Sequence, residues 1–82
     1  MSGAAYDERK LKELEADRRD ILKTVNENKR LLREFDEGKR QMSRGKHMAC
    51  VQTLHDAQHS LPEITKEIMV IKQRIARREH GK

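Results

Sequence analysis

The sequence has almost no aromatic residues. Its 82 residues include one Tyr, one Phe and no Trp, and they include a single Pro. Strands and ligand pockets draw on aromatic and β-branched residues, and all-β folds also need frequent turn residues. These absences argue against a sandwich, a barrel or an aromatic-lined pocket. An ordinary globular enzyme with a small-molecule substrate is therefore close to excluded.

Cysteine and long apolar runs are equally scarce. The lone Cys50 cannot form an intramolecular disulfide, and the chain opens without the apolar run of a secretory leader. We therefore expect an intracellular protein, either cytoplasmic or nuclear. No apolar run exceeds four residues, as in 68–71, whereas a membrane-spanning helix needs roughly 18. We expect no membrane insertion.

Charge outweighs hydrophobicity in the composition. Apolar residues make up 34% of the chain and charged residues 40%, with a formal net charge of +5. Any core must be thin, and intrinsic disorder becomes a serious competitor at this composition. The spacing of the apolar residues decides between a thin folded core and disorder.

The first half of the chain has the apolar spacing of a helix. Steps of three and four residues alternate, which predicts one amphipathic helix over 5–37 after a flexible N-terminus at 1–4. The polar Arg18 and Asn28 interrupt this seam. They either fix register and oligomeric state or reach out of the seam with only their stems covered. The first seam consists of Leu11, Leu14, Arg18, Ile21, Val25, Asn28, Leu32 and Phe35.

A glycine marks the predicted end of this helix. Residues 38–46 hold two glycines, four basic residues and one apolar residue, so we expect a basic turn there. Gly38 fits the position just after a helix, where the left-handed conformation is favourable only for Gly. The seam that follows is one residue out of phase with the first. This shift favours a break, and the alternative is one continuous helix with a skip residue.

The second half predicts another helix, over 47–80. Ser60 and Glu63 have the spacing of a capping box, and Pro62 fits the first turn of a helix. We therefore expect a kink or restart at Ser60–Pro62, with helical sections at 47–59 and 61–79 that share one face. Gly81 should end the last section. The second seam consists of Cys50, Leu54, Ala57, Leu61, Ile64, Ile68, Ile71 and Ile75.

Two arms of similar length joined by a turn predict an all-α fold, an antiparallel two-helix coiled-coil hairpin that forms a single domain. Two registers fit the seams equally well. Folding at about residue 41 sets Leu14 opposite Ile68. A shift of one heptad sets Ile21 opposite Ile68 instead, with as many apolar layers, and the sequence does not choose between them.

A lone hairpin of this size buries only one stripe of each helix, so its core contributes little stability. Apolar residues beside the seams would stay partly wet. We therefore predict that a partner protein or a second copy completes a helical bundle, the alternative being a marginally stable monomer. The predicted protein-interaction residues are Leu11, Leu14, Ile21, Leu22, Val25, Leu31, Leu32, Phe35, Leu54, Leu61, Ile64, Ile68, Met69, Val70, Ile71 and Ile75.

His47, Cys50, His55 and His59 form a dense group of candidate metal ligands. Helical geometry turns His55 and His59 away from His47, so the four side chains cannot converge on one ion. His55 and His59 can hold a metal only as a pair, and ordinary surface histidines are the favoured interpretation. Ser60 and these histidines include the residue types of a hydrolytic triad, but they lie on one solvent-exposed helix with no opposing wall to form an oxyanion site. We expect no metal, no cofactor and no catalytic site.

Cations gather at two poles of the predicted hairpin. Either pole can meet the phosphates of RNA or duplex DNA, or an acidic protein surface, and a solvated tip with helix-terminal charges is the plain alternative. The absence of nearby aromatics argues against base stacking, so nucleic-acid binding would be unselective. The candidate residues are Lys39, Arg40, Arg44 and Lys46 at the turn, and Arg74, Arg77 and Arg78 near the end.

Taken together, these patterns predict a non-enzymatic coiled-coil interaction module, a small structural or adaptor subunit of a larger protein assembly. One alternative is a hairpin that contacts nucleic acid through its basic turn. The other is an effector module that binds a small GTPase in the groove between its helices. Both alternatives rest on analogy with other helical hairpins.

Overall fold

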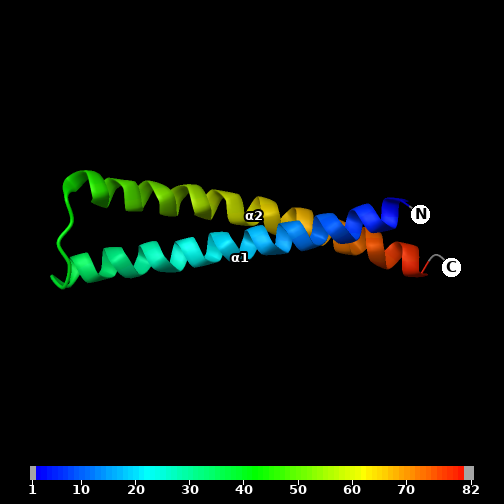
Figure 1. Cartoon of the computed structure of the whole chain (residues 1–82), viewed down its shortest axis with the longest axis horizontal. Coiled ribbons are helices and arrows are strands. Elements are labelled where there is room, and N and C mark those ends of the chain that lie inside the picture. The colour runs from blue at the N-terminus through cyan, green and yellow to red at the C-terminus, as the bar shows by residue number, and fades with distance from the viewer. Residues whose placement is uncertain (1, 81–82) are drawn as a thin grey trace.

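The computed structural model describes residues 2–80 and contains two long α-helices (Figure 1). Helix α1 spans Ser2–Asp36 and helix α2 spans Arg44–His80. The helices run antiparallel, so their free ends lie together at one end of a molecule that measures 60 × 18 × 15 Å. Residues 2–80 contain no strand. The predicted all-α antiparallel hairpin is confirmed.

Helix α1 begins earlier than predicted. The expected flexible N-terminus at 1–4 is helical from Ser2 onward, and Met1 lies outside the described residues. Two features favour this extension. Ala4 and Ala5 have high helix propensity, and the nearby Asp7 is buried and paired with arginines of α2, which ties this end of α1 to the other helix.

Gly38 ends α1 in the predicted way. It adopts a φ of 75°, in the left-handed region. Its N–H donates to the carbonyl of Phe35 at 3.1 Å, and the N–H of Lys39 donates to the carbonyl of Glu34 at 2.8 Å. These two bonds form a Schellman motif, which satisfies carbonyls that the end of the helix would otherwise leave without partners.

Helix α2 begins three residues earlier than predicted, at Arg44, so the turn is shorter than the expected 38–46. Ser43 is the N-cap. Its Oγ accepts a hydrogen bond from the backbone N–H of Lys46 at 3.1 Å. Its carbonyl accepts the first helical bond, from the N–H of His47 at 3.0 Å. Serine at this position satisfies a donor that the first turn leaves free.

Of the two predicted alternatives at Ser60–Pro62, a kink or a restart, the restart does not occur. Helix α2 continues through Pro62 without interruption. Ser60 does not act as a cap, because its Oγ donates to the carbonyl of Asp56 one turn earlier at 3.1 Å. Proline has no N–H to donate to the carbonyl of Gln58, and both Gln58 and Pro62 are exposed, so water can serve as the partner instead. Leu61 and Ile64 stay partly buried across this point, which keeps the chain helical.

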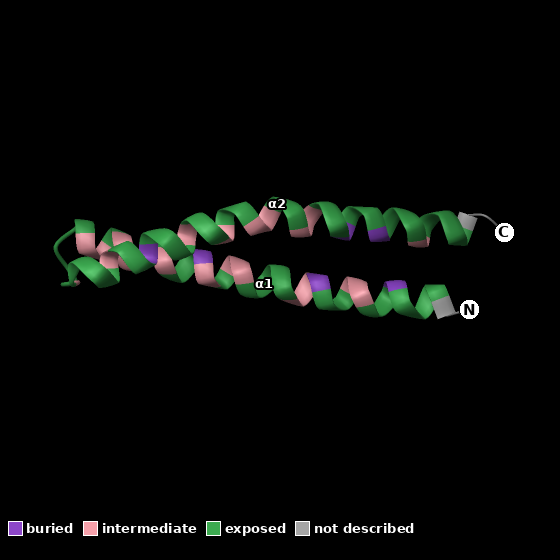
Figure 2. Ribbon diagram, turned by 90° about the horizontal axis from the view of Figure 1, so that it is seen from above, coloured by how far each residue is buried: buried purple, intermediate pink, exposed green. Residues whose placement is uncertain are grey.

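The core follows one narrow stripe on each helix (Figure 2). Its main cluster is formed by Leu14, Ile68 and Ile71, which are all buried. Val25 and Cys50 are buried nearer the turn. The core is therefore as thin as the composition predicts. Partly buried residues that pack against the main cluster are Leu11, Ile64 and Ile75.

The structure also chooses the register. Leu14 packs in one cluster with Ile68, which is the pairing obtained by folding at about residue 41. Near the turn, the rings of Phe35 and His47 pack with centroids 4.9 Å apart, in the same register. The register shifted by one heptad is therefore excluded.

Candidate interaction surface

Several large apolar side chains lie exposed beside the core. Tyr6 is 58% exposed, Met69 56% and Val70 46%. Met69 and Val70 were predicted to flank the seam in this way. Tyr6 was missed, because a residue so close to the predicted flexible N-terminus was not assigned to a packed face. Two further exposed residues lie in the half nearer the turn, Met48 and Val51.

Four of the predicted interaction residues are core residues and not surface residues. Leu14, Val25, Ile68 and Ile71 are buried. Their role in the single chain is to hold the hairpin together. The partly buried positions among the predicted interaction residues are Leu11, Ile21, Leu22, Leu31, Leu32, Phe35, Leu54, Leu61, Ile64 and Ile75.

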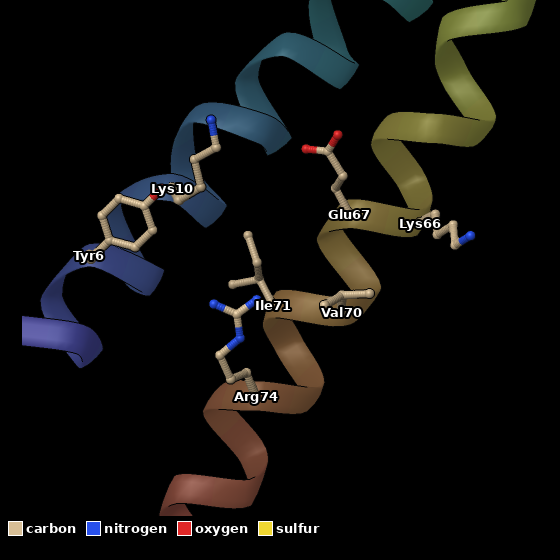
Figure 3. Close-up of a pocket in the computed structure, with 7 residues that line it drawn as sticks. All are labelled: Tyr6, Lys10, Lys66, Glu67, Val70, Ile71 and Arg74. Carbon is tan, nitrogen blue, oxygen red and sulfur yellow. The ribbon is translucent and has the colours of Figure 1, made fainter.

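One flank of the core is hollowed out next to Tyr6 and Val70 (Figure 3). This Tyr6–Val70 hollow has a volume of about 310 Å³ and is open to solvent. Its apolar wall comes from Tyr6, Val70 and Ile71. Three cations and one carboxylate surround that wall. The charged lining residues are Lys10, Lys66, Glu67 and Arg74.

A second hollow, of about 300 Å³, lies on the other flank of α2, where Met69 is exposed. Met69 and Val70 point in different directions because successive helical residues are 100° apart. One ion pair crosses this second hollow, with Lys72 Nζ 3.8 Å from Glu15 Oε2. The lining residues are Glu15, Arg18, Arg19, Thr65, Ile68, Met69 and Lys72.

A buried carboxylate joins the two helices at their free ends. The side chain of Asp7 is 1% exposed, and its Oδ1 accepts a hydrogen bond from Arg74 Nη1 at 3.2 Å. Arg78 Nη2 lies 2.8 Å from Oδ2, as an ion pair and not as an aligned hydrogen bond. A buried carboxylate needs such partners to compensate its lost hydration. The sequence pattern gave no sign of this pair, since it depends on the register.

This arrangement changes the interpretation of the cations near the C-terminal end. Arg74 and Arg78, predicted as contacts for phosphate or acidic surfaces, already share the carboxylate of Asp7. Arg77 is exposed. Two of the three predicted cations at this pole are therefore paired with a buried carboxylate, while all three side chains keep exposed surface.

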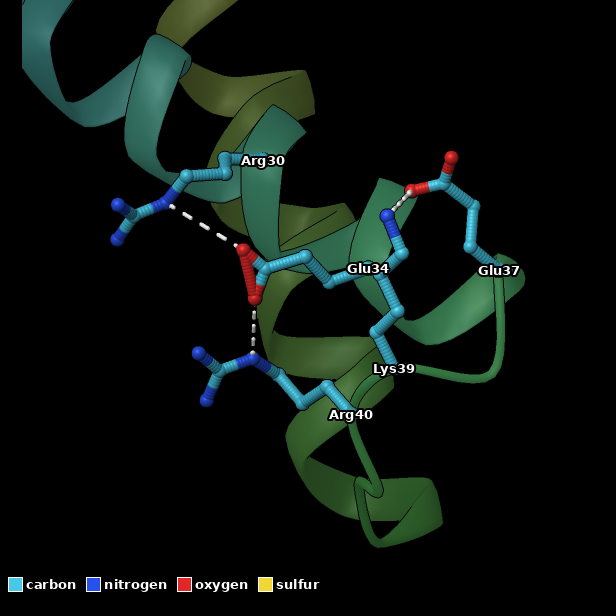
Figure 4. Close-up of polar contacts among 5 residues, drawn as sticks. All are labelled: Arg30, Glu34, Glu37, Lys39 and Arg40. Carbon is cyan, nitrogen blue, oxygen red and sulfur yellow. Dashed lines mark hydrogen bonds and ion pairs between the residues drawn. The ribbon is translucent and has the colours of Figure 1, made fainter.

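Carboxylates also offset part of the positive charge at the turn (Figure 4). Arg40 Nε donates to Glu34 Oε1 at 3.0 Å, and Arg30 Nε lies 3.9 Å from the other oxygen of Glu34. Lys39 Nζ lies 3.8 Å from Glu37 Oε1. Two of the four predicted turn cations thus face acidic residues from the end of α1. The other two, Arg44 and Lys46, are exposed in the first turn of α2.

The two polar residues of the first seam are accommodated in different ways. Arg18 is exposed, and its Nε donates to Thr65 Oγ1 of α2 at 3.2 Å. Asn28 donates from Nδ2 to the carbonyl of Thr24 in its own helix at 2.8 Å. Arg18 therefore reaches out of the seam and links the helices at their margin, and Asn28 is satisfied locally.

The histidine and cysteine group divides into two parts. His47 and Cys50 lie toward the seam, and Cys50 is buried. His55 and His59 are exposed and lie against each other, with ring centroids 4.4 Å apart. Within residues 2–80, no three or more His, Cys, Asp or Glu side chains are grouped so as to hold a metal ion.

Neither α1 nor α2, as described over residues 2–80, contains a stretch long and apolar enough to cross a bilayer. Comparison of the chain with protein-family models, with curated proteins and with solved structures found no match. Any functional interpretation therefore depends on the residues and geometry of this hairpin.

Proposed function

We propose that the chain is a non-enzymatic coiled-coil interaction module, a small structural or adaptor subunit that a partner protein completes into a helical bundle. The observation that carries this proposal is the exposure of Tyr6, Met69 and Val70 on the two flanks of the best-packed part of the core. Apolar side chains grouped in this way are typical of surfaces that another protein covers.

The energetics of a thin core support the proposal. Burying one exposed Val or Met side chain contributes about 1.5 to 3 kcal/mol. A single core in a chain of this size contributes only about 3 to 5 kcal/mol. Met69 and Val70 are already about half buried, so covering both would add about 1.5 to 3 kcal/mol, a large fraction of the stability of the hairpin.

The lining of the Tyr6–Val70 hollow favours one kind of partner. Lys10, Lys66 and Arg74 surround its apolar wall, and Glu67 is the one carboxylate among its lining residues. An open hollow between two antiparallel helices suits a third helix with an apolar stripe. Acidic residues beside that stripe would complement the cations and would steer association.

The nucleic-acid alternative receives less support. Glu34 and Glu37 face Arg40 and Lys39 at the turn, which reduces the charge available to phosphates. The small-GTPase alternative uses the same exposed flanks as the main proposal. It differs from that proposal in one measurable property, since binding should then depend on the nucleotide state of the GTPase.

A photo-reactive amino acid at Val70 tests the proposal in the cells that make the protein. We expect crosslinking of Val70 to a protein partner, and no crosslinking from Asn26, which is exposed on α1 and lines neither hollow. A product of twice the 9.7 kDa chain mass would identify a second copy as the partner. If Val70 and Met69 crosslink no more than Asn26 while the protein remains helical, the proposal is wrong.

Two alanine variants separate binding from folding in the same helix. Val70→Ala should leave the free energy of unfolding nearly unchanged, because the side chain is exposed, yet it should lower recovery of the crosslinked partner from Met69. Ile68→Ala should instead destabilise the hairpin by about 2 to 4 kcal/mol, since it removes a buried side chain. Equal effects of the two variants on partner recovery at matched helicity would contradict the assignment of Val70 to the surface.

A further inference from the structure

The exposed face of α2 carries two histidines whose ring nitrogens approach each other. His55 and His59 are one helical turn apart, and their Nε2 atoms are 3.2 Å apart. Both residues are exposed, and neither lines the Tyr6–Val70 hollow or the hollow beside Met69. Neither the packing of the hairpin nor the proposed interaction surface accounts for this pair.

We infer that His55 and His59 form a two-residue chelating site for a divalent transition-metal ion of the Zn²⁺, Ni²⁺ or Cu²⁺ type. Two Zn–N bonds of about 2.0 to 2.1 Å at a tetrahedral angle place their nitrogens about 3.3 Å apart. The observed Nε2 separation of 3.2 Å agrees with that spacing. Imidazole nitrogen is also a ligand that these ions favour.

Two neighbouring side chains support the required tautomer of His55. Asp56 Oδ1 lies 3.9 Å from His55 Nδ1, and Gln52 Nε2 donates to the same oxygen at 2.9 Å. At 3.9 Å this carboxylate does not hydrogen-bond the ring, but its negative charge favours a proton on Nδ1 over one on Nε2, and the Nε2 lone pair is then free for a metal. The metal then takes the place of the hydrogen that the two Nε2 atoms share.

The site is open. Residues 2–80 supply no third ligand, so the remaining coordination positions are left to water or to groups of another molecule. Binding is therefore reversible and weaker than at a closed four-ligand site. It also stabilises α2 just before Pro62, where the helix lacks a backbone hydrogen bond, because the unfolded chain does not hold the two imidazoles together.

The test uses the full chain without a polyhistidine tag and measures binding of NiCl₂ and of ZnCl₂ by calorimetry. We expect one ion per chain, and a loss of affinity of about tenfold or more in His59→Asn and in His55→Asn, since each removes one of the two ligands. His47→Asn is the matched control, because His47 lies beside Phe35 and not beside the pair. The control should bind as the wild type does.

A second measurement links the ion to the helix. The midpoint of thermal unfolding, followed by circular dichroism, should rise with NiCl₂ in the wild type and in the His47→Asn variant. It should not rise in the His59→Asn variant. Binding of equal strength in the His59→Asn variant, or no saturable binding in the wild type, would overturn the inference.

Discussion

Asp7 and Arg78 bring opposite ends of the chain together, with Arg78 Nη2 2.8 Å from Asp7 Oδ2. Arg74 holds the other oxygen, so one carboxylate binds two successive turns of α2 to α1. Arg74 also lines the Tyr6–Val70 hollow. Ion pairs thus hold the free ends of the two helices together, near the point where the apolar stripe ends.

Replacing Asp7 by Ala should lower the free energy of unfolding by about 1 to 2 kcal/mol. Breaking a buried ion pair costs more than this, but Arg74 and Arg78 keep about half of their side-chain surface exposed, and water compensates part of the loss. Urea denaturation followed by circular dichroism measures the change. Glu8→Ala, at the exposed neighbouring position, is the control and should change stability by less than about 0.5 kcal/mol. Equal stability of the two variants would show that the pair contributes nothing.

Two glycine substitutions should act in opposite directions. Gly38→Ala should destabilise the protein by about 1 kcal/mol, because a residue with a Cβ is strained at its φ of 75°. Gly45→Ala should stabilise it by about 0.5 kcal/mol, since Gly45 is helical and a Cβ there meets no atom within 4 Å. Thermal unfolding of the two variants checks both signs. A neutral Gly38→Ala variant would argue against the Schellman ending of α1.

Variants at Ser60 and Pro62 test whether α2 is continuous. Pro62→Ala should stabilise the hairpin by about 1 to 3 kcal/mol, because it supplies the N–H that the carbonyl of Gln58 lacks. Ser60→Ala should change stability by less than about 0.5 kcal/mol, since the Ser60 Oγ donates only to the carbonyl of Asp56 in the preceding turn. A helix start at Ser60 would produce the opposite pattern, with the loss of a cap costing about 1 kcal/mol.

The compensation of charge at the turn predicts weak binding to nucleic acid. Arg44 and Lys46 are the turn cations without a nearby carboxylate among the ion pairs of residues 2–80, so about two phosphate contacts are available. The logarithm of the affinity for duplex RNA or DNA should then fall against log salt with a slope of about 2 or less in magnitude. Titration by fluorescence anisotropy at several salt concentrations measures this slope. A slope near 4 in magnitude, reduced to about 2 in the Arg44→Gln, Lys46→Gln double variant, would restore the nucleic-acid hypothesis.

Much of this fold is predictable because its main signals are local. The spacing of apolar residues defines both helices, and Gly38 marks the end of α1, since each depends only on neighbouring residues. The errors at the boundaries have the same origin. Ser60 has the capping-box pattern with Glu63 but lies inside α2, whereas Ser43, which has Lys46 three residues later, is the N-cap that the structure uses.

The register needed information that apolar spacing does not contain. Both registers offer equal apolar layers, and the polar pairs distinguish them, since Arg18 meets Thr65 and Asp7 meets Arg74 in one register alone. The same reason explains why the burial of Asp7 and the Tyr6–Val70 hollow were not predicted. Both features are formed by residues from the two ends of the chain, and they exist only once the register is known.

The start of α1 and the end of α2 lie at the same end of the molecule, which has a practical consequence for the design of fusion proteins. Ser2 and His80 lie at the same end of a rod 60 Å long, next to the Tyr6–Val70 hollow. A fluorescent protein or affinity handle fused to either terminus would crowd the surface where a partner is expected to dock. The short connection between the helices, at the far tip, is the better place for such an insertion.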